Sequence, residues 1–213
     1  MINKEVALII GAGDSLGSAV ARVFAQNNFI TVVARRNGDQ LSLLKEEIEK
    51  NGGKCFAYSL DARKEEDVIN FINKIETEIG EINVAVYNIG ANIRFNILET
   101  TSKKYYKVWE MATFGAFLMG REVTRKMIPR KKGTIIFTGA TASIRGKEGF
   151  AAFSSAKQAK RALAQSMAKE LAPKGIHVAH VIVDGAIDTP WVNKLFPESV
   201  SYTHLRAHET KKH

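Results

Sequence analysis

The chain has 213 residues, of which 45% are hydrophobic and 25% are charged, a balance typical of one soluble globular domain with its own core. The formal net charge is +9, but lysine and arginine are scattered and their densest cluster, at 130–132, falls where a helix is expected to end, so we expect no nucleic-acid partner. The single cysteine, Cys55, can form no internal disulfide, and the apolar run near the amino end is too short for a signal sequence or a membrane span, so we expect a cytoplasmic protein with no membrane partner.

Short β-branched runs alternate with longer segments in which apolar residues recur every three or four positions. The short runs predict strands at 5–10, 29–34, 54–59, 82–88, 133–139 and 176–183. The segments between them predict helices at 16–26, 40–50, 64–79, about 98–127 and 150–171. The strands are apolar along nearly their whole length, as strands covered on both faces must be. The alternation therefore predicts an α/β fold, a doubly wound, Rossmann-like parallel sheet of six strands, in one domain over 1–197.

The first strand runs into GAGDSLG, residues 11–17, and then into a helix. Gly11 permits a tight turn, Gly13 lets the backbone approach a pyrophosphate, and Gly17 lets the helix pack closely on the strand. The helix N-terminus then faces the phosphates, and Asp14 and Ser15 can cap that helix. A simple glycine-rich turn is the alternative, but the position after the first strand of an α/β chain favours a dinucleotide site. The residues expected there are Gly11, Gly13, Asp14, Ser15, Leu16 and Gly17.

The end of the second strand indicates which dinucleotide binds. An acidic residue there would bond the ribose 2′-hydroxyl of NAD, whereas cations suit the 2′-phosphate of NADP. This chain has Arg35 and Arg36 at that point, so we expect NADP(H) to be favoured over NAD(H). Two solvated arginines are the alternative, and Asp14, if it lies nearby, would repel a phosphate.

With these motifs the sequence resembles the single-domain short-chain dehydrogenases/reductases. The resemblance covers about residues 4–196 and includes the six-residue separation of Gly11 and Gly17, with Ser15 where the family has its middle glycine. Further matches follow the third, fourth and sixth strands, at Asp61-Ala62, Tyr87-Asn88-Ile89-Gly90, and Asp184-Gly185 with Thr189. The resemblance implies cofactor contacts from Asp61, Ala62, Asn88, Gly90, Gly185 and Thr189.

The same resemblance implies a catalytic tetrad, and this chain departs from it. The family's YxxxK motif falls on Phe153 to Lys157, its serine on Ala140 and its asparagine on Ala112. In the family the lysine bonds the nicotinamide ribose and lowers the pKa of the tyrosine hydroxyl, which transfers the proton, whereas phenylalanine has no proton to give. Of the tetrad only Lys157 is present; it can still hold the ribose but has no phenol whose pKa it could lower. Substitute hydroxyls are available at Thr138, Thr141, Ser143, Ser154 and Ser155, and Thr141 and Ser143 are the expected candidates. The alternative is that each of these hydroxyls caps or packs around the helix start.

Two functions remain open on these residues. The first is an NADP-linked oxidoreductase that transfers hydride to or from a small carbonyl or alcohol substrate at an atypical site. The second is a cofactor-binding protein without catalysis, which acts as a sensor or as the inert partner of an oligomer. The resemblance implies a homo-oligomer, either a dimer or a tetramer. For Lys157 a solvated helix lysine is the alternative, because Lys160, Arg161 and Lys169 are expected as surface cations of the same helix.

The residues from Val200 onward break the pattern. They hold three of the five histidines, His204, His208 and His213, and no apolar periodicity. A metal site there is disfavoured, and we expect none. The stretch VSYTHLRAHET resembles a translated sequencing adapter, so we expect 198–213 to be a non-native tail and the natural domain to continue with a further strand.

Overall fold

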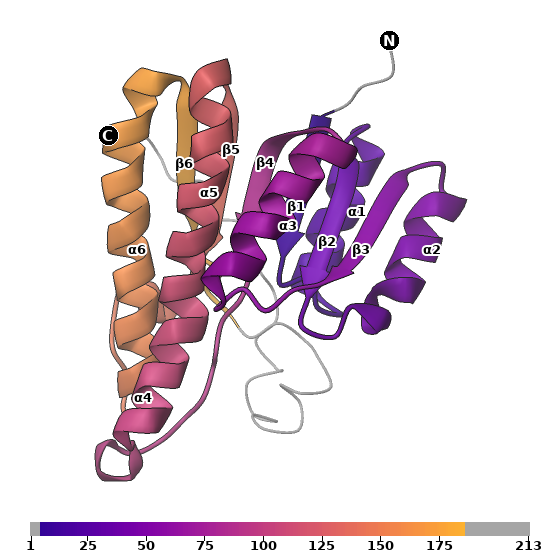
Figure 1. The fold of residues 1–213 in the computed structure, drawn as a ribbon. Helices are drawn as coiled ribbons and strands as arrows, with labels where there is room; N and C mark the ends of the chain where they lie inside the picture. The colour runs from indigo at the N-terminus through magenta and orange to yellow at the C-terminus, as the bar shows by residue number, and fades with distance from the viewer. Residues whose placement is uncertain (1–4, 186–213) are drawn as a thin grey trace.

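The structure is a computed structural model, and it describes residues 5–185 (Figure 1). A six-stranded sheet forms its centre, with every neighbouring pair parallel and the order β3-β2-β1-β4-β5-β6. The strands are β1 (Glu5–Ile10), β2 (Ile30–Arg35), β3 (Lys54–Ser59), β4 (Glu81–Tyr87), β5 (Gly133–Thr138) and β6 (Ile176–Val181). This arrangement confirms the doubly wound α/β prediction. The strand expected at 176–183 ends earlier, at Val181.

Helices cover the sheet on both faces. They are α1 (Leu16–Gln26), α2 (Ser42–Lys50), α3 (Glu65–Glu78), α4 (Ser102–Trp109), α5 (Gly115–Arg130) and α6 (Ala151–Leu171). Side chains of α1 and α2 share one buried cluster with Ile9, and side chains of α3, α5 and α6 share another with Leu8. Successive residues of a strand point to opposite faces, so β1 alone contributes to both layers of the core.

The long helix expected at about 98–127 is interrupted. It begins at Ser102, and a π-helical turn over Glu110–Phe114 separates α4 from α5. A π turn opens the helix backbone to other partners, and here the Tyr87 hydroxyl donates a 2.7 Å hydrogen bond to the carbonyl oxygen of Met111. Because a residue of β4 supplies this contact, the apolar spacing of the helix itself did not predict the turn.

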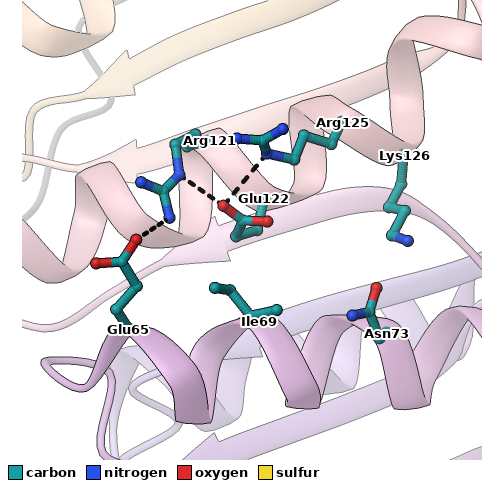
Figure 2. A pocket seen from close by; sticks show the side chains of 7 residues that line it. All are labelled: Glu65, Ile69, Asn73, Arg121, Glu122, Arg125 and Lys126. Carbon is teal, nitrogen blue, oxygen red and sulfur yellow. Dashed lines mark hydrogen bonds and ion pairs between the residues drawn. The ribbon is translucent and has the colours of Figure 1, made fainter.

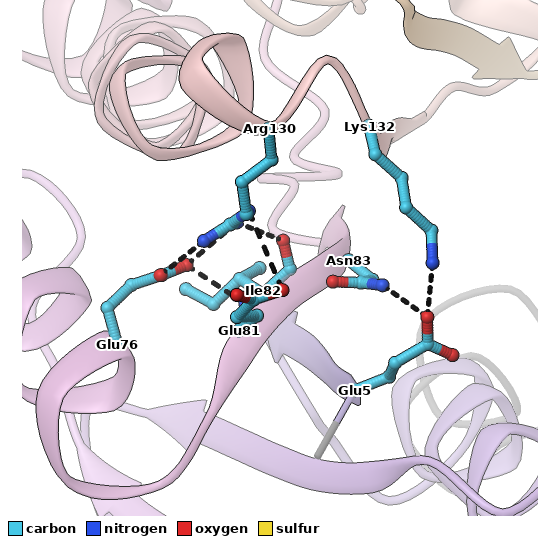
Figure 3. A network of polar contacts seen from close by, with 7 residues as sticks. All are labelled: Glu5, Glu76, Glu81, Ile82, Asn83, Arg130 and Lys132. Atoms are coloured by element: carbon cyan, nitrogen blue, oxygen red, sulfur yellow. Dashed lines mark hydrogen bonds and ion pairs between the residues drawn. The ribbon is translucent and has the colours of Figure 1, made fainter. Parts of the chain in front are cut away.

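The densest basic cluster, Arg130 to Lys132, lies between α5 and β5 as expected, and the fold uses its charges (Figure 3). The Arg130 guanidinium donates to the Glu76 carboxylate at 2.6 Å and to the carbonyl oxygen of Ile82 at 3.0 Å. Lys132 forms an ion pair with Glu5. These contacts fasten α3 and α5 to the amino edge of the sheet, away from the edge where the candidate site residues gather.

Candidate cofactor and active site

The candidate residues gather at the carboxyl edge of the sheet. Gly11, Arg35, Asp61, Asn88 and Ala140 stand at or just after the ends of the first five strands. In the observed strand order the crossovers leave β1 in opposite directions, so β1 and β4 flank the switch point where sheets of this type bind ligands. Residues far apart in the sequence therefore meet at one edge.

The loop after β1 has the geometry that its three glycines predict. Gly11 has a φ of +90°, and a Cβ there would lie 2.8 Å from Cγ1 and 2.9 Å from the backbone nitrogen of Ile89. A Cβ on Gly17 would lie 2.5 Å from the carbonyl oxygen of Gly11, so α1 packs directly on the loop. A Cβ on Gly13 would meet no atom of residues 5–185 within 4 Å. Gly11 and Gly17 are therefore fixed by packing, whereas Gly13 borders open space.

The expected caps of α1 make other contacts. The Ser15 side chain forms no capping hydrogen bond, and Asp14 pairs instead with Arg35, with 3.1 Å between Oδ1 and Nη1. The Asp14 side chain is 89% exposed, so this pair contributes at most about 1 kcal/mol. Arg36 is exposed beside Arg35. α1 therefore begins without a side-chain cap at Ser15, and among its first N–H groups that of Ser18 is bonded to the carbonyl oxygen of Gly13 at 3.1 Å. An anion can bind the N–H groups that remain, and two guanidinium groups stand at the end of β2.

Asp61 is held by an arginine that the sequence analysis did not single out. The Arg63 guanidinium donates to both carboxylate oxygens, at 2.8 and 2.6 Å. These hydrogen bonds hold the pKa of Asp61 below its ordinary value. Arg63 also lies 3.6 Å from Glu110, which belongs to the π turn. A ligand that contacts Asp61 therefore meets a bidentate ion pair and not a free carboxylate.

The turn after β4 joins the phosphate loop to α6. The Asn88 backbone donates to the carbonyl oxygen of Ile10 at 2.8 Å, and its side chain donates to that of Gly11 at 3.0 Å. Gly90 is exposed, and a Cβ on it would lie 3.2 Å from Nζ of Lys157. Asn88 thus supports the loop, while Gly90 leaves room in front of the lysine.

Lys157 is not a surface lysine. It is 5% exposed, and its Nζ donates to the carbonyl oxygen of Thr138 at 3.1 Å, at the end of β5. Its Nζ lies 5.5 Å from the ring centroid of Phe153, which is also buried. Burial lowers the pKa of Lys157 to about 8. The structure therefore places this amine at the carboxyl edge and excludes the solvated alternative.

The other residues expected around the reaction make structural contacts. The backbone N–H of Ala140 donates to Oγ of Ser143 at 3.1 Å, and Ser143 is buried. The Thr141 hydroxyl donates to the carboxylate of Asp184. Ala112 lies in the π turn and is fully buried. The hydroxyls of Thr141 and Ser143 thus serve the turn after β5.

Two further titratable residues lie at the same edge, and the sequence analysis missed both. Lys160 was expected on the surface, but it is 0% exposed, and its Nζ donates to the carbonyl oxygen of Ile89 at 3.2 Å. The Nε2 of His180, on β6, is buried and has no hydrogen-bond partner among residues 5–185. Burial and the nearby lysines lower the pKa of His180 to about 4. A sequence signal existed for Lys160, because a residue three positions after Lys157 shares its helix face.

A separate hollow of about 350 Å³ lies on the surface between α3 and α5 (Figure 2). Arg121 bridges Glu65, at 2.6 Å, and Glu122, at 2.5 Å, across its wall. Arg125 adds a contact to Glu122 at 3.5 Å. Both carboxylates of this hollow are paired with its arginines, and none of its lining residues belongs to the carboxyl edge, so it is not the candidate site.

Within residues 5–185, histidine, cysteine and acidic side chains form no group of three or more that could hold a metal ion. In the same range, no helix combines the length and the apolar character needed to cross a bilayer. Gly185 is exposed at the end of this range. Thr189 and the histidines of the expected tail lie outside the described residues.

Comparisons with known proteins agree with this architecture. A family model described as short chain dehydrogenase matches residues 5–199. The chain is 28% identical over 194 residues to a 3-oxoacyl-(acyl-carrier-protein) reductase of Bos taurus, and the match covers 91% of this chain and 80% of the relative. It is 29% identical over 179 residues to a 2-dehydro-3-deoxy-D-gluconate 5-dehydrogenase of Formosa agariphila, and this match covers 83% of this chain and 67% of the relative.

Solved structures give the same result. A short-chain dehydrogenase from Rhodopseudomonas palustris is 47% identical, with a TM-score of 0.83, and the match covers 92% of this chain and 91% of that one. A xylitol dehydrogenase solved with bound NAD⁺ is 26% identical, with a TM-score of 0.86, over 91% of this chain and 75% of that one. The six-stranded sheet and its helices are therefore shared with known dehydrogenases.

Proposed function

Because the chain belongs to the short-chain dehydrogenase family, we propose that it binds NADP(H) and transfers hydride between this cofactor and a small carbonyl or alcohol substrate. The observation that carries the proposal is the loop after β1. Gly11 and Gly17 pack the turn against its neighbours, Gly13 borders open space, and the start of α1 has no side-chain cap at Ser15. Such a loop offers backbone N–H groups to a pyrophosphate.

The nicotinamide, when bound, supplies or accepts the hydride. The chain's own residues supply the rest of the site: Lys157 donates to the ribose, and Gly90 leaves room for it in front of the amine. Further cofactor contacts are proposed for Asp61, with Arg63 bound to it, and for the segment at 184–185. The site is atypical because Phe153 and Ala140 bring neither an acidic hydroxyl nor a hydroxyl that polarises a carbonyl.

The preference for NADP(H) rests on Arg35 and Arg36 at the end of β2. Asp14 is largely exposed and, among residues 5–185, forms its ion pair with Arg35, so a 2′-phosphate can displace it at small cost. Titration of both reduced cofactors by quenching of intrinsic fluorescence measures the preference. We expect NADPH to bind about tenfold or more tightly than NADH, and Arg35→Asp to reverse that order.

The matched control for this titration is Arg125→Asp, which changes charge equally on an exposed position of α5. It should leave both affinities unchanged. Equal affinities for the two cofactors in the unmodified protein, or a preference for NADH, would contradict the assignment of Arg35.

The second candidate function is a cofactor-binding protein without catalysis. Phe153 and Ala140 favour it, because the loss of a general acid alone removes about 10²- to 10⁴-fold of rate. Consumption of NADPH with a panel of small ketones and aldehydes separates the two functions. Tight NADPH binding with no turnover of any substrate selects the sensor or inert-partner function.

We also propose that the protein forms a homo-oligomer. A row of aromatic rings runs along α4, the π turn and α5, with centroids 5.9 Å apart for Tyr106 and Trp109, 5.8 Å for Trp109 and Phe114, and 6.2 Å for Phe114 and Phe117. Tyr106 and Phe117 are exposed. A partly exposed aromatic row is the composition that interfaces favour, and sedimentation of the protein in solution measures the assembly.

A further inference from the structure

Lys157 and Lys160 form a pair of amines inside the fold. They lie on one face of α6, and both are buried. Their Nζ atoms donate to carbonyl oxygens at the ends of neighbouring strands, Lys157 to Thr138 at 3.1 Å and Lys160 to Ile89 at 3.2 Å. The two residues are three positions apart on this face, and each amine shifts the pKa of the other.

The pair has no counter-charge in the part of the chain that the structure describes. No carboxylate of residues 5–185 forms an ion pair with either amine, whereas other lysines of the chain do so. The ionisable groups that face the cluster are Tyr87 from β4, His180 from β6 and Arg161 from α6. Two ammonium groups buried side by side on this helix face would be two uncompensated charges in a low dielectric, so the pair holds one proton.

The position of each amine determines which one carries the charge. Lys160 is fully enclosed, with its Nζ 5.5 Å from the Tyr87 ring centroid. Lys157 stands behind the exposed Gly90, at the open side of the edge. The proton therefore belongs to Lys157, and the neutral Lys160 offers a lone pair.

We propose that Lys160 is a positioning residue of the cofactor site: its neutral amine accepts a hydrogen bond from the Lys157 ammonium, which keeps Lys157 charged and leaves one N–H for the ribose. This inference rests on the proposed function for its ligand. The donor count supports it, because an ammonium has three N–H groups. One is bound to Thr138, the proposed bond to Lys160 takes the second, and the third remains for the ribose.

The sign of the effect follows from the surroundings of each amine. Burial lowers the pKa of Lys157, while the hydrogen bond to Lys160 raises it. Burial and the charge of Lys157 hold the pKa of Lys160 well below its ordinary value. Replacing Lys160 by methionine should therefore lower the pKa of Lys157, because the ammonium loses a polar neighbour and gains an apolar one of similar length.

The first experiment follows the lysine side-chain nitrogens by NMR in ¹⁵N-lysine-labelled protein as the pH is raised. In the unmodified chain we expect Lys160 to be neutral at neutral pH and Lys157 to lose its proton near pH 8, with assignments from Lys157→Met and Lys160→Met. In Lys160→Met the midpoint of Lys157 should fall by about half a pKa unit or more. Lys169→Met, an exposed position of the same helix, is the control and should change nothing.

Two results would overturn the inference: two charged lysines at neutral pH in the unmodified chain, or an unchanged midpoint in a folded Lys160→Met. If Lys160→Met does not fold, the titration of the unmodified chain still decides between one proton and two.

The second experiment measures the dissociation constant of NADPH against pH. Affinity in the unmodified protein should fall as Lys157 deprotonates, and in Lys160→Met it should fall at lower pH and be several-fold weaker at neutral pH. Identical profiles in the two proteins would refute the positioning role. Absence of NADPH binding at every pH, with the NMR titration as expected, would refute the proposed function and leave the one-proton pair standing.

Discussion

The loop after β1 is built from backbone, whereas the region around α6 is built from side chains. In the loop, Gly11 and Gly17 have no space for a Cβ, and the groups offered to a ligand are N–H groups that every residue carries. Around α6, the chemistry depends on what stands at Phe153 and Lys157, both of which are packed in the interior. A buried ring fills the place of Phe153 with or without a hydroxyl. The comparison teaches that a fold can keep its cofactor loop while its reactive side chains change.

The largest effect is expected from restoring the missing hydroxyls, which tests whether the side chains around α6 limit the reaction. Phe153→Tyr and Ala140→Ser should each gain little alone, because groups that act as a unit are strongly non-additive. Together they should raise NADPH turnover by about 10²- to 10⁴-fold, or roughly 3 to 5.5 kcal/mol. Lys157 already lies 5.5 Å from the ring centroid at position 153, so Lys157→Ala should abolish the gain by leaving the new phenol with a pKa near 10.

Assays with small ketones and aldehydes check this prediction. If the unmodified protein already turns over as fast as the double variant, the site is rearranged, and Thr141 and Ser143 become the first positions to mutate. Their present bonds, to Asp184 and to the backbone of Ala140, would then have to be exchanged during the reaction.

A second test uses the pH dependence of stability, which should come from the α6 region and not from the loop. The pKa of Lys157 is about 8 in the fold and 10.5 as its ordinary value, so between these pH values the unfolded chain binds more protons. Stability should therefore rise with pH across that window, by on the order of 3 kcal/mol, and Lys160 adds in the same direction.

Urea unfolding at both ends of the window measures this rise. The double variant Lys157→Met/Lys160→Met should lose most of it, while Lys169→Met should keep it. Parallel pH profiles for the unmodified protein and the double variant would show that neither amine is buried as described.

A third test distinguishes the packing role of Gly17 from the binding role of Gly13 in the loop. Gly17→Ala places a Cβ 2.5 Å from the carbonyl oxygen of Gly11, so the free energy of unfolding should fall by about 2 kcal/mol or more. Gly13→Ala meets nothing within 4 Å, so stability should change by less than about 0.5 kcal/mol while NADPH affinity falls. Urea unfolding and cofactor titration on the same samples separate packing from binding, and equal stability losses in the two variants would contradict the assigned roles.

The sequence predicted the backbone half of the site better than the side-chain half, for physical reasons. The sheet and the Gly11 turn follow from local patterns, namely apolar runs and glycines at a fixed spacing. The pair of Asp61 with Arg63 depends on how a loop folds back, which no periodicity encodes. The π turn depends on Tyr87, far away in the chain.

The burial of Lys160 and His180 was not predicted, although their positions in the helix and the strand are compatible with it. Lys160 falls on the same helix face as the buried Lys157, and His180 falls two residues after the buried Val178 on a strand. The sequence analysis expected Lys160 on the surface and made no prediction for His180, because titratable residues are usually exposed. Position was the better guide here, and a buried amine that forms no ion pair within residues 5–185 is the kind of exception that marks a site.

The tripeptide Asn88-Ile89-Gly90 has a mechanical consequence. It contacts Gly11 through the Asn88 amide and the Ile89 side chain, holds Lys160 through the Ile89 carbonyl, and lies against Lys157 at Gly90. This short segment therefore sets the distance between the loop proposed to bind the phosphates and the lysine proposed to bind the ribose. If this segment shifts, the loop and Lys157 shift with it. The distance that a bound dinucleotide must span is therefore fixed by three residues that need take no part in the chemistry.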